Sequence, residues 1–356
     1  MRPLNVGIIG CGTIARRHAD RLTELGEDIA GVADINPDAR SDFAAAYDVP
    51  ETYERYETMI ADLSLDLVVV AVPNFLHAGC AIAALEDDTD VFVEKPLADD
   101  LDAARRIADA AADSDGRVVV GFVRGFSEWF RDLDARATDG EFGEIYDVDV
   151  EYVRRRGIPQ LGSWFTRKDQ SGGGVLIDAG VHFIHLALSL LGFPDVESVS
   201  ASTGAHFGNK DDYTYISMWG GDPIDGATFD TEDYARGLIR TTDGATIHVH
   251  SAWASNTDPR QQIRVQGNEA GVTAAHESGA FVPTMYSTDR EALTETELTV
   301  RESEMFEAQW RYVTDIVRGE REHVRNTLEE GLVVQRVVEA MYESAETGRE
   351  VVFAED

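Results

Sequence analysis

A lysine and an acid–base pair are the side chains of this sequence best suited to chemistry. Asp178 and His182 are four residues apart, so on a helix they share one face. Lys95 is one of only three lysines in the chain, with Lys168 and Lys210, and it ends a predicted parallel strand. Ligands bind at the carboxyl edge of such sheets. Imidazole can accept a proton near neutral pH and an ammonium can stabilise an oxyanion, so these side chains could assist oxidation of a hydroxyl group.

Each of these residues also has a purely structural interpretation. Lys95 could be a surface lysine paired with Glu94, and Asp178 could cap a helix that carries His182 as an ordinary residue. The scarcity of lysine favours the chemical interpretation of Lys95. Pro96 supports it, because a residue before proline favours an extended backbone, which helps to direct the lysine into the crevice. For the pair, the glycine run that precedes it, together with Lys95, favours chemistry.

A glycine-rich motif near the N-terminus predicts a dinucleotide site. It follows the first predicted strand and opens a helix: Gly10-Cys11-Gly12-Thr13-Ile14-Ala15. The glycines allow a tight turn and the close approach of a pyrophosphate to the helix N-terminus. Asp34 ends the second strand 22 residues after Gly12, where an acidic side chain accepts hydrogen bonds from ribose hydroxyls. Asp34 would repel a 2′-phosphate, which favours NAD, while Arg40 leaves NADP as an alternative. The cofactor contacts expected from this region are Gly10, Gly12, Thr13, Ile14 and Asp34.

The elements that would carry these residues alternate between strand and helix over residues 1–122. Continuous apolar runs predict buried strands of a parallel sheet at residues 4–10, 29–34, 66–73, 91–96 and 117–122. Apolar residues at helical spacing predict helices between them, for example over Leu101–Ala112. Strand and helix in repeated order predict a doubly wound α/β domain.

Residues 123–356 change to strands with few helices between them. Alternation of apolar and polar residues predicts strands at 145–154, 213–219, 234–240, 245–253 and 261–266, with a hairpin turn at residues 242–244. Two helices are expected, over residues 178–191 and 304–318. We therefore expect a second, α+β domain with an open, mostly antiparallel sheet.

The charge of the chain excludes several classes of function. The 356 residues include 66 acidic and 31 basic ones, for a net charge of −35. Such a chain repels nucleic-acid phosphates and anionic lipid surfaces. An acidic excess with almost no lysine is what molar salt favours, since screening weakens self-repulsion there, and we interpret the chain as halophilic. The alternative is a merely acidic protein of an ordinary cytoplasm.

Cysteine usage and apolar runs indicate a cytoplasmic protein. Cys11 and Cys80 are too few for a disulfide framework and do not have metal-ligand spacing. A strand-like run follows the first three residues directly, without a signal peptide. The apolar stretches are shorter than the roughly 20 residues needed to cross a bilayer. We therefore expect no partnership with membranes or nucleic acid.

Further motifs follow the predicted strands or open the predicted helix. They are Val72-Pro73-Asn74-Phe75-Leu76-His77, Glu94-Lys95-Pro96, Gly121-Phe122-Val123-Arg124 and Gly172-Gly173-Gly174-Val175-Leu176-Ile177-Asp178-Ala179-Gly180-Val181-His182. In this order and at these spacings they resemble the Gfo/Idh/MocA family, the group of glucose–fructose oxidoreductase and inositol dehydrogenase. Gln266-Gly267 and Gly348-Arg349-Glu350-Val351 fit as well, so the resemblance covers nearly the whole chain.

The resemblance implies an N-terminal Rossmann domain that binds NAD or NADP, a C-terminal α/β domain, and a hydride-transfer site between them. It also implies homodimers or homotetramers that associate through the open sheet. The catalytic group would be Lys95, Asp178 and His182. We assign His182 as general base, Lys95 as the group that holds the substrate hydroxyl and stabilises the alkoxide, and Asp178 as the group that binds a neighbouring hydroxyl.

The same motifs suggest further contacts with the cofactor and the substrate. Beyond the glycine-rich turn, the expected cofactor contacts are Pro73, Asn74, His77, Glu94 and Lys95. Beyond the catalytic group, the expected substrate contacts are Arg124, Trp164 and His185. Asn74 could instead be an N-cap, Trp164 a core residue and His185 a helix-surface histidine.

Two departures from the family pattern leave the substrate open. The family usually has an aspartate where this chain has His185. The segment Arg124-Gly125-Phe126 lacks a polar side chain that often reaches substrate. His248 and His250 share one face of a strand without a third ligand nearby, so we expect no metal site.

The sequence therefore predicts a nicotinamide-dependent dehydrogenase that oxidises a ring hydroxyl, or an aldose C1 hydroxyl, of a sugar or cyclitol. Three alternatives come from the same resemblance. An NAD-dependent glycosidase would retain its cofactor and give no net NADH. A sugar–sugar oxidoreductase would hold its cofactor tightly. A non-catalytic sensor would bind NAD without turnover, although the presence of Lys95, Asp178 and His182 argues against it.

Overall fold

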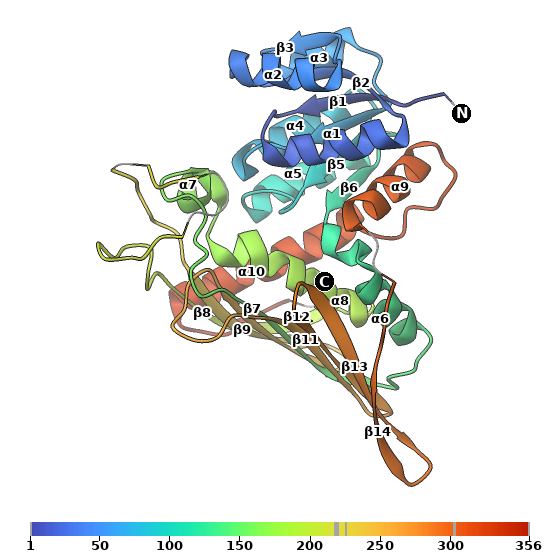
Figure 1. Cartoon of the computed structure of the whole chain (residues 1–356), viewed down its shortest axis with the longest axis vertical. Helices are drawn as coiled ribbons and strands as arrows, with labels where there is room; N and C mark the ends of the chain where they lie inside the picture. Colours follow the sequence, from blue (N-terminus) through green and yellow to red (C-terminus); the bar gives the residue numbers. More distant parts are fainter. Residues whose placement is uncertain (1, 217–220, 225, 302–303, 355–356) are drawn as a thin grey trace. The chain divides into compact units, whose positions relative to one another are not determined.

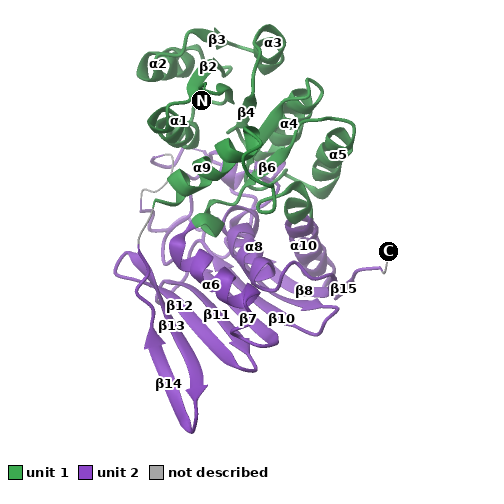
Figure 2. Ribbon diagram, turned by 90° about the vertical axis from the view of Figure 1, so that its right-hand side faces the viewer, with its two compact units in different colours: residues 1–126, 303–332 green, residues 127–302, 333–356 purple. Residues whose placement is uncertain are grey.

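The computed structural model describes residues 2–216, 221–224, 226–301 and 304–354. The chain forms two compact units (Figure 2). Unit 1 comprises Met1–Phe126 and Ser303–Leu332, and unit 2 comprises Ser127–Glu302 and Val333–Asp356. The predicted division at residue 122 places everything after it in the second domain, whereas the first unit also contains residues 303–332.

Unit 1 is built on a six-stranded sheet in the order β3-β2-β1-β4-β5-β6, with every neighbouring pair parallel. The strands are β1 (Asn5–Ile9), β2 (Asp28–Ala33), β3 (Glu51–Tyr53), β4 (Leu67–Val70), β5 (Asp90–Glu94) and β6 (Val118–Gly121). The helices are α1 (Thr13–Leu25), α2 (Pro37–Tyr47), α3 (Tyr56–Asp62), α4 (His77–Leu85), α5 (Leu101–Ala112) and α9 (Met305–Val317), with short 3-10 turns η1 (Asn74–Leu76) and η2 (Val123–Phe126) (Figure 1). The doubly wound α/β prediction is confirmed.

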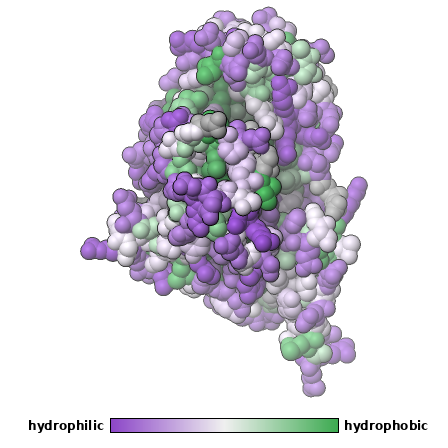
Figure 3. All heavy atoms as spheres, turned by 60° about the vertical axis from the view of Figure 1, so that its left-hand side comes forward, coloured by the Kyte–Doolittle hydropathy of each residue, from purple (hydrophilic) through white to green (hydrophobic). Residues whose placement is uncertain are grey.

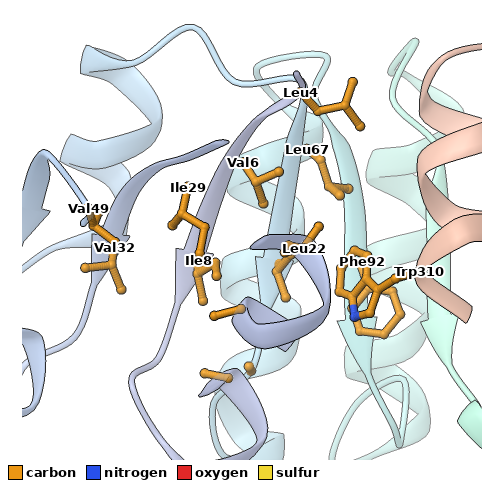
Figure 4. Close-up of a cluster of buried hydrophobic side chains, with 14 of the residues drawn as sticks. Leu4, Val6, Ile8, Leu22, Ile29, Val32, Val49, Leu67, Phe92 and Trp310 are labelled. Atoms are coloured by element: carbon orange, nitrogen blue, oxygen red, sulfur yellow. The ribbon is translucent and has the colours of Figure 1, made fainter. Parts of the chain in front are cut away.

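The core of unit 1 explains why α9 belongs to it. Side chains of the central strands and of α1 form one apolar cluster, including Ile8, Leu22 and Phe92 (Figure 4). Trp310 and Val313 of α9 are fully buried in the same cluster. Truncation of a fully buried tryptophan to alanine costs about 3–5 kcal/mol of stability. The burial of Trp310 therefore holds α9 in unit 1, although α9 is distant from the other elements of this unit in the sequence.

Unit 2 is built on a nine-stranded sheet in the order β14-β13-β12-β11-β7-β10-β9-β8-β15. Only β7 and β10 pair in parallel among these strands, which confirms the mostly antiparallel sheet. The strands are β7 (Ile145–Val153), β8 (Val196–Gly204), β9 (Tyr234–Thr241), β10 (Thr246–Ala252), β11 (Arg260–Gly267), β12 (Ala270–Glu277), β13 (Ala280–Asp289), β14 (Ala292–Glu297) and β15 (Val351–Val352).

Helices cover one face of this sheet. Figure 2 shows α6 (Glu128–Thr138), α8 (Val181–Leu190) and α10 (Leu328–Thr347) on that face. The shorter helical elements are η3 (Trp164–Thr166), α7 (Lys168–Ser171) and the π-helical turn η4 (Leu176–Gly180). On β7, Val148 and Val150 are buried, while Asp149 and Glu151 alternate with them and pair with Arg264 and His250. The sheet is therefore open and charged on its other face. Association through that face stays a prediction.

One predicted strand is wrong in the part that the structure describes. Residues 213–216 form no strand, and residues 217–219 of that prediction lie outside the described residues. The aromatic alternation is used locally instead: the Arg156 guanidinium lies 5.0 Å from the ring centroid of Phe207 and 5.7 Å from that of Tyr213. The Tyr215 hydroxyl donates to the Gly221 carbonyl at 2.9 Å. Alternating aromatic residues can therefore occur in a loop, where their side chains make local contacts, as well as in a strand.

One helical stretch is longer and more apolar than the sequence led us to expect. Lys168–Leu190 spans 23 residues with a mean hydropathy of 1.5 in its most apolar window, enough by length and composition to cross a membrane. Yet 83 % of that window is buried within the fold, as in a core helix.

On the face shown in Figure 3, hydrophilic residues predominate and hydrophobic ones are scattered.

Candidate active site

The glycine-rich turn between β1 and α1 contains two glycines with different requirements. Gly10 has φ of +101°, and a Cβ there would lie 2.4 Å from the Ala71 carbonyl oxygen, so the fold itself requires glycine. Gly12 is the N-cap of α1 with φ of −73°, and a Cβ there would meet no atom within 4 Å. The first turn of α1, which begins with Thr13 and Ile14, has no side-chain cap and no acidic residue. These features suit a bound pyrophosphate.

Two alanine substitutions separate these requirements. We expect Gly10→Ala to lower the free energy of unfolding by more than about 2 kcal/mol, because the backbone must shift. We expect Gly12→Ala to stay within about 0.5 kcal/mol of the wild type but to raise the Kd for NADH about tenfold or more, because the methyl group projects toward the pyrophosphate. Urea unfolding and NADH fluorescence titration measure the two effects. Unchanged NADH affinity in Gly12→Ala would rule out this turn as the pyrophosphate site.

Asp34 joins the glycine-rich turn to the end of β2. Its Oδ2 accepts the Cys11 N–H at 2.8 Å and its Oδ1 accepts the Asn36 N–H at 2.8 Å. Both oxygens keep further lone pairs, so the carboxylate can still accept bonds from ribose hydroxyls. The Arg40 guanidinium donates to the Asp34 carbonyl. Burial, with a smaller effect of Asp34, raises the pKa of the Cys11 thiol to about 12, so Cys11 is no nucleophile.

The turn after β4 is tied to the residue that follows Lys95. The His77 ring is 1 % exposed, with Nδ1 2.8 Å from the Pro96 carbonyl oxygen and Nε2 2.9 Å from the Val72 carbonyl oxygen. Burial lowers the pKa of His77 more than these hydrogen bonds raise it, so the ring acts as a structural link. Asn74 is buried in η1, whose N-cap position is Pro73, so the N-cap alternative does not apply.

Lys95 lies at the carboxyl end of β5 and is half-buried. The Lys95 N–H donates to Glu94 Oε2 at 3.1 Å, and Glu94 Oε1 lies 2.8 Å from His18 Nε2. Glu94 is 8 % exposed, and its carboxylate bonds to these protein groups. A contact of Glu94 with the cofactor stays a prediction. Arg124, in η2, is half-buried in the same unit.

In unit 2, the glycine run lies against Glu232 and Tyr342, two residues that no motif in the sequence marks. A Cβ at Gly174 would lie 1.9 Å from the Glu232 carbonyl oxygen, and one at Gly173 would lie 2.0 Å from the Tyr342 hydroxyl. The Glu232 carboxylate accepts the Gly174 N–H at 2.8 Å, the Leu176 N–H at 3.0 Å and the Tyr342 hydroxyl at 3.0 Å. Burial, and then Glu232, raise the pKa of Tyr342 well above its ordinary value, so Tyr342 remains a donor. This cluster anchors the start of the helical stretch that carries Asp178 and His182.

Asp178 lies in the π-helical turn η4, and His182 follows in α8. The sequence predicted one α-helix from residue 178, but the helical stretch starts earlier and its first turn is π-helical. Such turns recur at functional sites. Asp178 Oδ2 accepts the indole N–H of the fully buried Trp253 at 3.0 Å. Neither helical segment has a side-chain cap, so Asp178 is held by Trp253 rather than serving as an N-cap. Asp178 and His182 are both half-buried.

The two other predicted substrate contacts in unit 2 differ in exposure. His185 is 2 % exposed and its ring centroid lies 5.6 Å from that of Phe193, so the helix-surface alternative is wrong. Trp164 is half-buried and stacks on Phe165 with ring centroids 3.8 Å apart. A role of His185 in substrate binding stays a prediction, and its burial sets it apart from His182.

No group of three or more His, Cys, Asp or Glu side chains that could hold a metal occurs in the part of the chain that the structure describes. His248 Nε2 lies 3.2 Å from Asp147 Oδ1, and His250 Nδ1 lies 3.5 Å from Glu151 Oε1. These histidines belong to the charged open face of the sheet.

Comparisons with known proteins agree with both units. Residues 4–122 match the model of an oxidoreductase family with an NAD-binding Rossmann fold, and residues 130–273 match that of the GFO/IDH/MocA C-terminal domain. D-glucoside 3-dehydrogenase of Escherichia coli is 29 % identical over 355 residues, covering 98 % of this chain and 97 % of its own. A putative UDP-kanosamine synthase oxidoreductase subunit of Amycolatopsis mediterranei is 33 % identical over 245 residues, covering 68 % of this chain and 64 % of its own.

A solved structure is similar over the whole chain. The crystal structure of GenD2 from gentamicin A biosynthesis, in complex with NAD, superposes with a TM-score of 0.79 at 25 % identity, covering 100 % of this chain and 97 % of GenD2. The interpretation of the acidic composition as a halophilic adaptation stays a prediction.

Proposed function

Since the chain belongs to the GFO/IDH/MocA family of oxidoreductases, with an NAD-binding Rossmann domain, we propose that it is a dehydrogenase that oxidises a ring hydroxyl, or an aldose C1 hydroxyl, of a sugar or cyclitol. One observation carries the proposal. Gly12, Asp34 and Lys95 follow β1, β2 and β5, so the anion-binding turn, the ribose acceptor and the lysine all lie at the carboxyl edge of one parallel sheet. That edge is where such sheets bind dinucleotides and their substrates.

We assign the chemistry of the reaction to three side chains. His182 takes the proton of the reacting hydroxyl, because an imidazole with a pKa near neutrality is suited to that transfer. The Lys95 ammonium holds that oxygen and stabilises the alkoxide as the proton leaves. Asp178, held by Trp253, accepts a hydrogen bond from a neighbouring hydroxyl and orients the ring. The nicotinamide, when bound, supplies the hydride acceptor. The residues that would hold the cofactor include the α1 N-terminus and Asp34.

We propose NAD as the preferred cofactor. The Asp34 carboxylate would repel a 2′-phosphate, and the Asp34 backbone carbonyl accepts from Arg40, so this guanidinium is engaged beside it. The names of two relatives support a sugar as the substrate class: one is a D-glucoside 3-dehydrogenase and the other a putative UDP-kanosamine synthase oxidoreductase subunit.

The proposal is tested by reduction of NAD and NADP with a panel of aldoses, glucosides and inositols, in molar KCl and in dilute buffer. We expect net NADH formation with at least one of them, faster with NAD than with NADP. Cofactor that stays bound without net NADH would instead support a glycosidase or a sugar–sugar oxidoreductase. Bound NAD with no change in any sugar would support a sensor and would overturn the proposal.

A further inference from the structure

A buried chain of hydrogen bonds in unit 1 ends at Lys95. The Trp310 indole N–H donates to His18 Nδ1 at 3.0 Å, and His18 Nε2 lies 2.8 Å from Glu94 Oε1. The other oxygen, Glu94 Oε2, accepts the Lys95 N–H at 3.1 Å. The chain links α9, α1 and β5, three elements distant from one another in the sequence.

These groups are shielded from water. His18 and Trp310 are 0 % exposed and Glu94 is 8 % exposed. The His18 ring lies edge-on to Phe92, with centroids 5.1 Å apart, and tilted to Phe306 at 6.0 Å. In such surroundings a carboxylate is costly unless hydrogen bonds and charge compensate it.

The hydrogen bonds define the tautomer of His18. An indole N–H can only donate, so Nδ1 of His18 must accept, and the ring proton lies on Nε2 and donates to Glu94. Burial alone would raise the pKa of Glu94, but the bond from His18 and the charge of Lys95 hold it below its ordinary value. Glu94 is therefore a buried anion with a fixed orientation.

We propose that His18 is a positioning residue for Lys95: by orienting the Glu94 carboxylate, it holds the Lys95 backbone and keeps a fixed negative charge near the lysine ammonium. The inference rests on the proposed function only where it concerns turnover. If the role were packing alone, an aromatic or aliphatic side chain would fill this apolar site at lower cost than a polar ring joined to a buried carboxylate. The site instead holds the polar pair of His18 and Glu94, and the second carboxylate oxygen accepts the Lys95 N–H.

Two amide substitutions separate orientation from packing. The Nε2 of a glutamine at position 18 can replace His18 Nε2 as donor to Glu94, whereas the Oδ1 of an asparagine can replace Nδ1 as acceptor for Trp310 but cannot reach Glu94. Both remove the ring, so both should lower the melting temperature by similar amounts. His18→Asn should lose Glu94 orientation, while His18→Gln should keep most of it. Glu94→Gln, with nearly the shape of glutamate, removes the charge directly.

The first readout is the reactivity of Lys95 and does not depend on turnover. Acetylation by acetic anhydride is followed by peptide mass spectrometry, with the exposed Lys168 and Lys210 as internal references. Because the Glu94 carboxylate holds the Lys95 backbone, loss of that hydrogen bond leaves the Lys95 side chain more mobile and more accessible to the reagent. We expect His18→Asn and Glu94→Gln to raise the relative rate at Lys95 roughly three- to tenfold, and His18→Gln to raise it less.

The second readout is turnover on a substrate found for the wild type. We expect kcat to fall about tenfold further in His18→Asn than in His18→Gln, with the Kd for NADH little changed. Equal Lys95 reactivity in His18→Asn and His18→Gln would overturn the proposal. Where His18→Asn does not fold, unchanged Lys95 reactivity in Glu94→Gln overturns it. A wild type without turnover contradicts the proposed function alone, since the acetylation result still decides the positioning role.

Discussion

Lys95→Ala should lower kcat by about 10²–10⁴-fold while changing the Kd for NADH little. The substitution removes the positive charge that we propose stabilises the alkoxide, at the carboxyl end of β5, and leaves the turn at Gly12 and the Asp34 carboxylate in place. Glu94 would then lack the charge of Lys95 but keep its bond to His18, so the fold of unit 1 should persist. Stopped-flow or steady-state NADH formation measures kcat, and fluorescence titration measures the Kd.

Lys210→Ala is the matched control. Lys210 is exposed, and its Nζ lies 5.3 Å from the ring centroid of Phe207, so the substitution removes the same charge away from the strand edges. We expect its kcat to remain within about twofold of the wild type. Ethylamine added to Lys95→Ala should restore part of the rate, because a free ammonium can supply the missing charge. Undiminished turnover in Lys95→Ala would remove this lysine from the chemistry.

The sheet of unit 1 could be predicted from sequence because its central strands are covered on both faces. Every residue of β4 (Leu67–Val70) is fully buried, and such strands appear as continuous apolar runs. The edge strand β3 (Glu51–Tyr53) was missed because it has three residues, of which Glu51 and Thr52 are exposed. Its pairing depends on β2, which no local pattern reveals.

The sheet of unit 2 could be predicted only in part. Strands β7, β9, β10 and β11 alternate clearly and were found to within a few residues. The outer strand β14 (Ala292–Glu297) is exposed at nearly every position, so alternation gives no signal there. The unit to which α9 belongs could not be predicted either. Its periodicity predicts a helix, but its place in unit 1 depends on a hydrogen bond from Trp310 to His18, 292 residues away along the chain.

The candidate site shows the same limit. Residues with unusual types or spacing, such as Lys95 and the glycine run, could be selected from sequence. The groups that hold them could not: Glu232 is 58 residues from Gly174, and Trp253 is 75 residues from Asp178. A buried His18 on the apolar side of α1 was a signal that could have been used, since a polar residue among apolar neighbours needs a partner.

His182→Asn should lower kcat by about 10²–10⁴-fold near neutral pH, because the hydroxyl proton loses its acceptor. If His182 is the base, the profile of kcat/KM against pH should lose its fall on the acid side in this variant, and the residual rate should rise steadily with hydroxide. His276→Asn is the control: His276 is an exposed histidine of β12 whose ring centroid lies 5.3 Å from that of Phe281. Its profile should match that of the wild type.

A double variant tests whether the contributions of His182 and Lys95 to the reaction depend on each other. If the general base and the charge that stabilises the alkoxide act in the same transition state, each depends on the other, and removing both should cost little more than removing the more important one. We therefore expect kcat of Lys95→Ala/His182→Asn to fall within about tenfold of the slower single variant. Losses that multiply in full would mean that the two side chains act independently of each other. An unchanged acid limb in His182→Asn would transfer the role of base to another group.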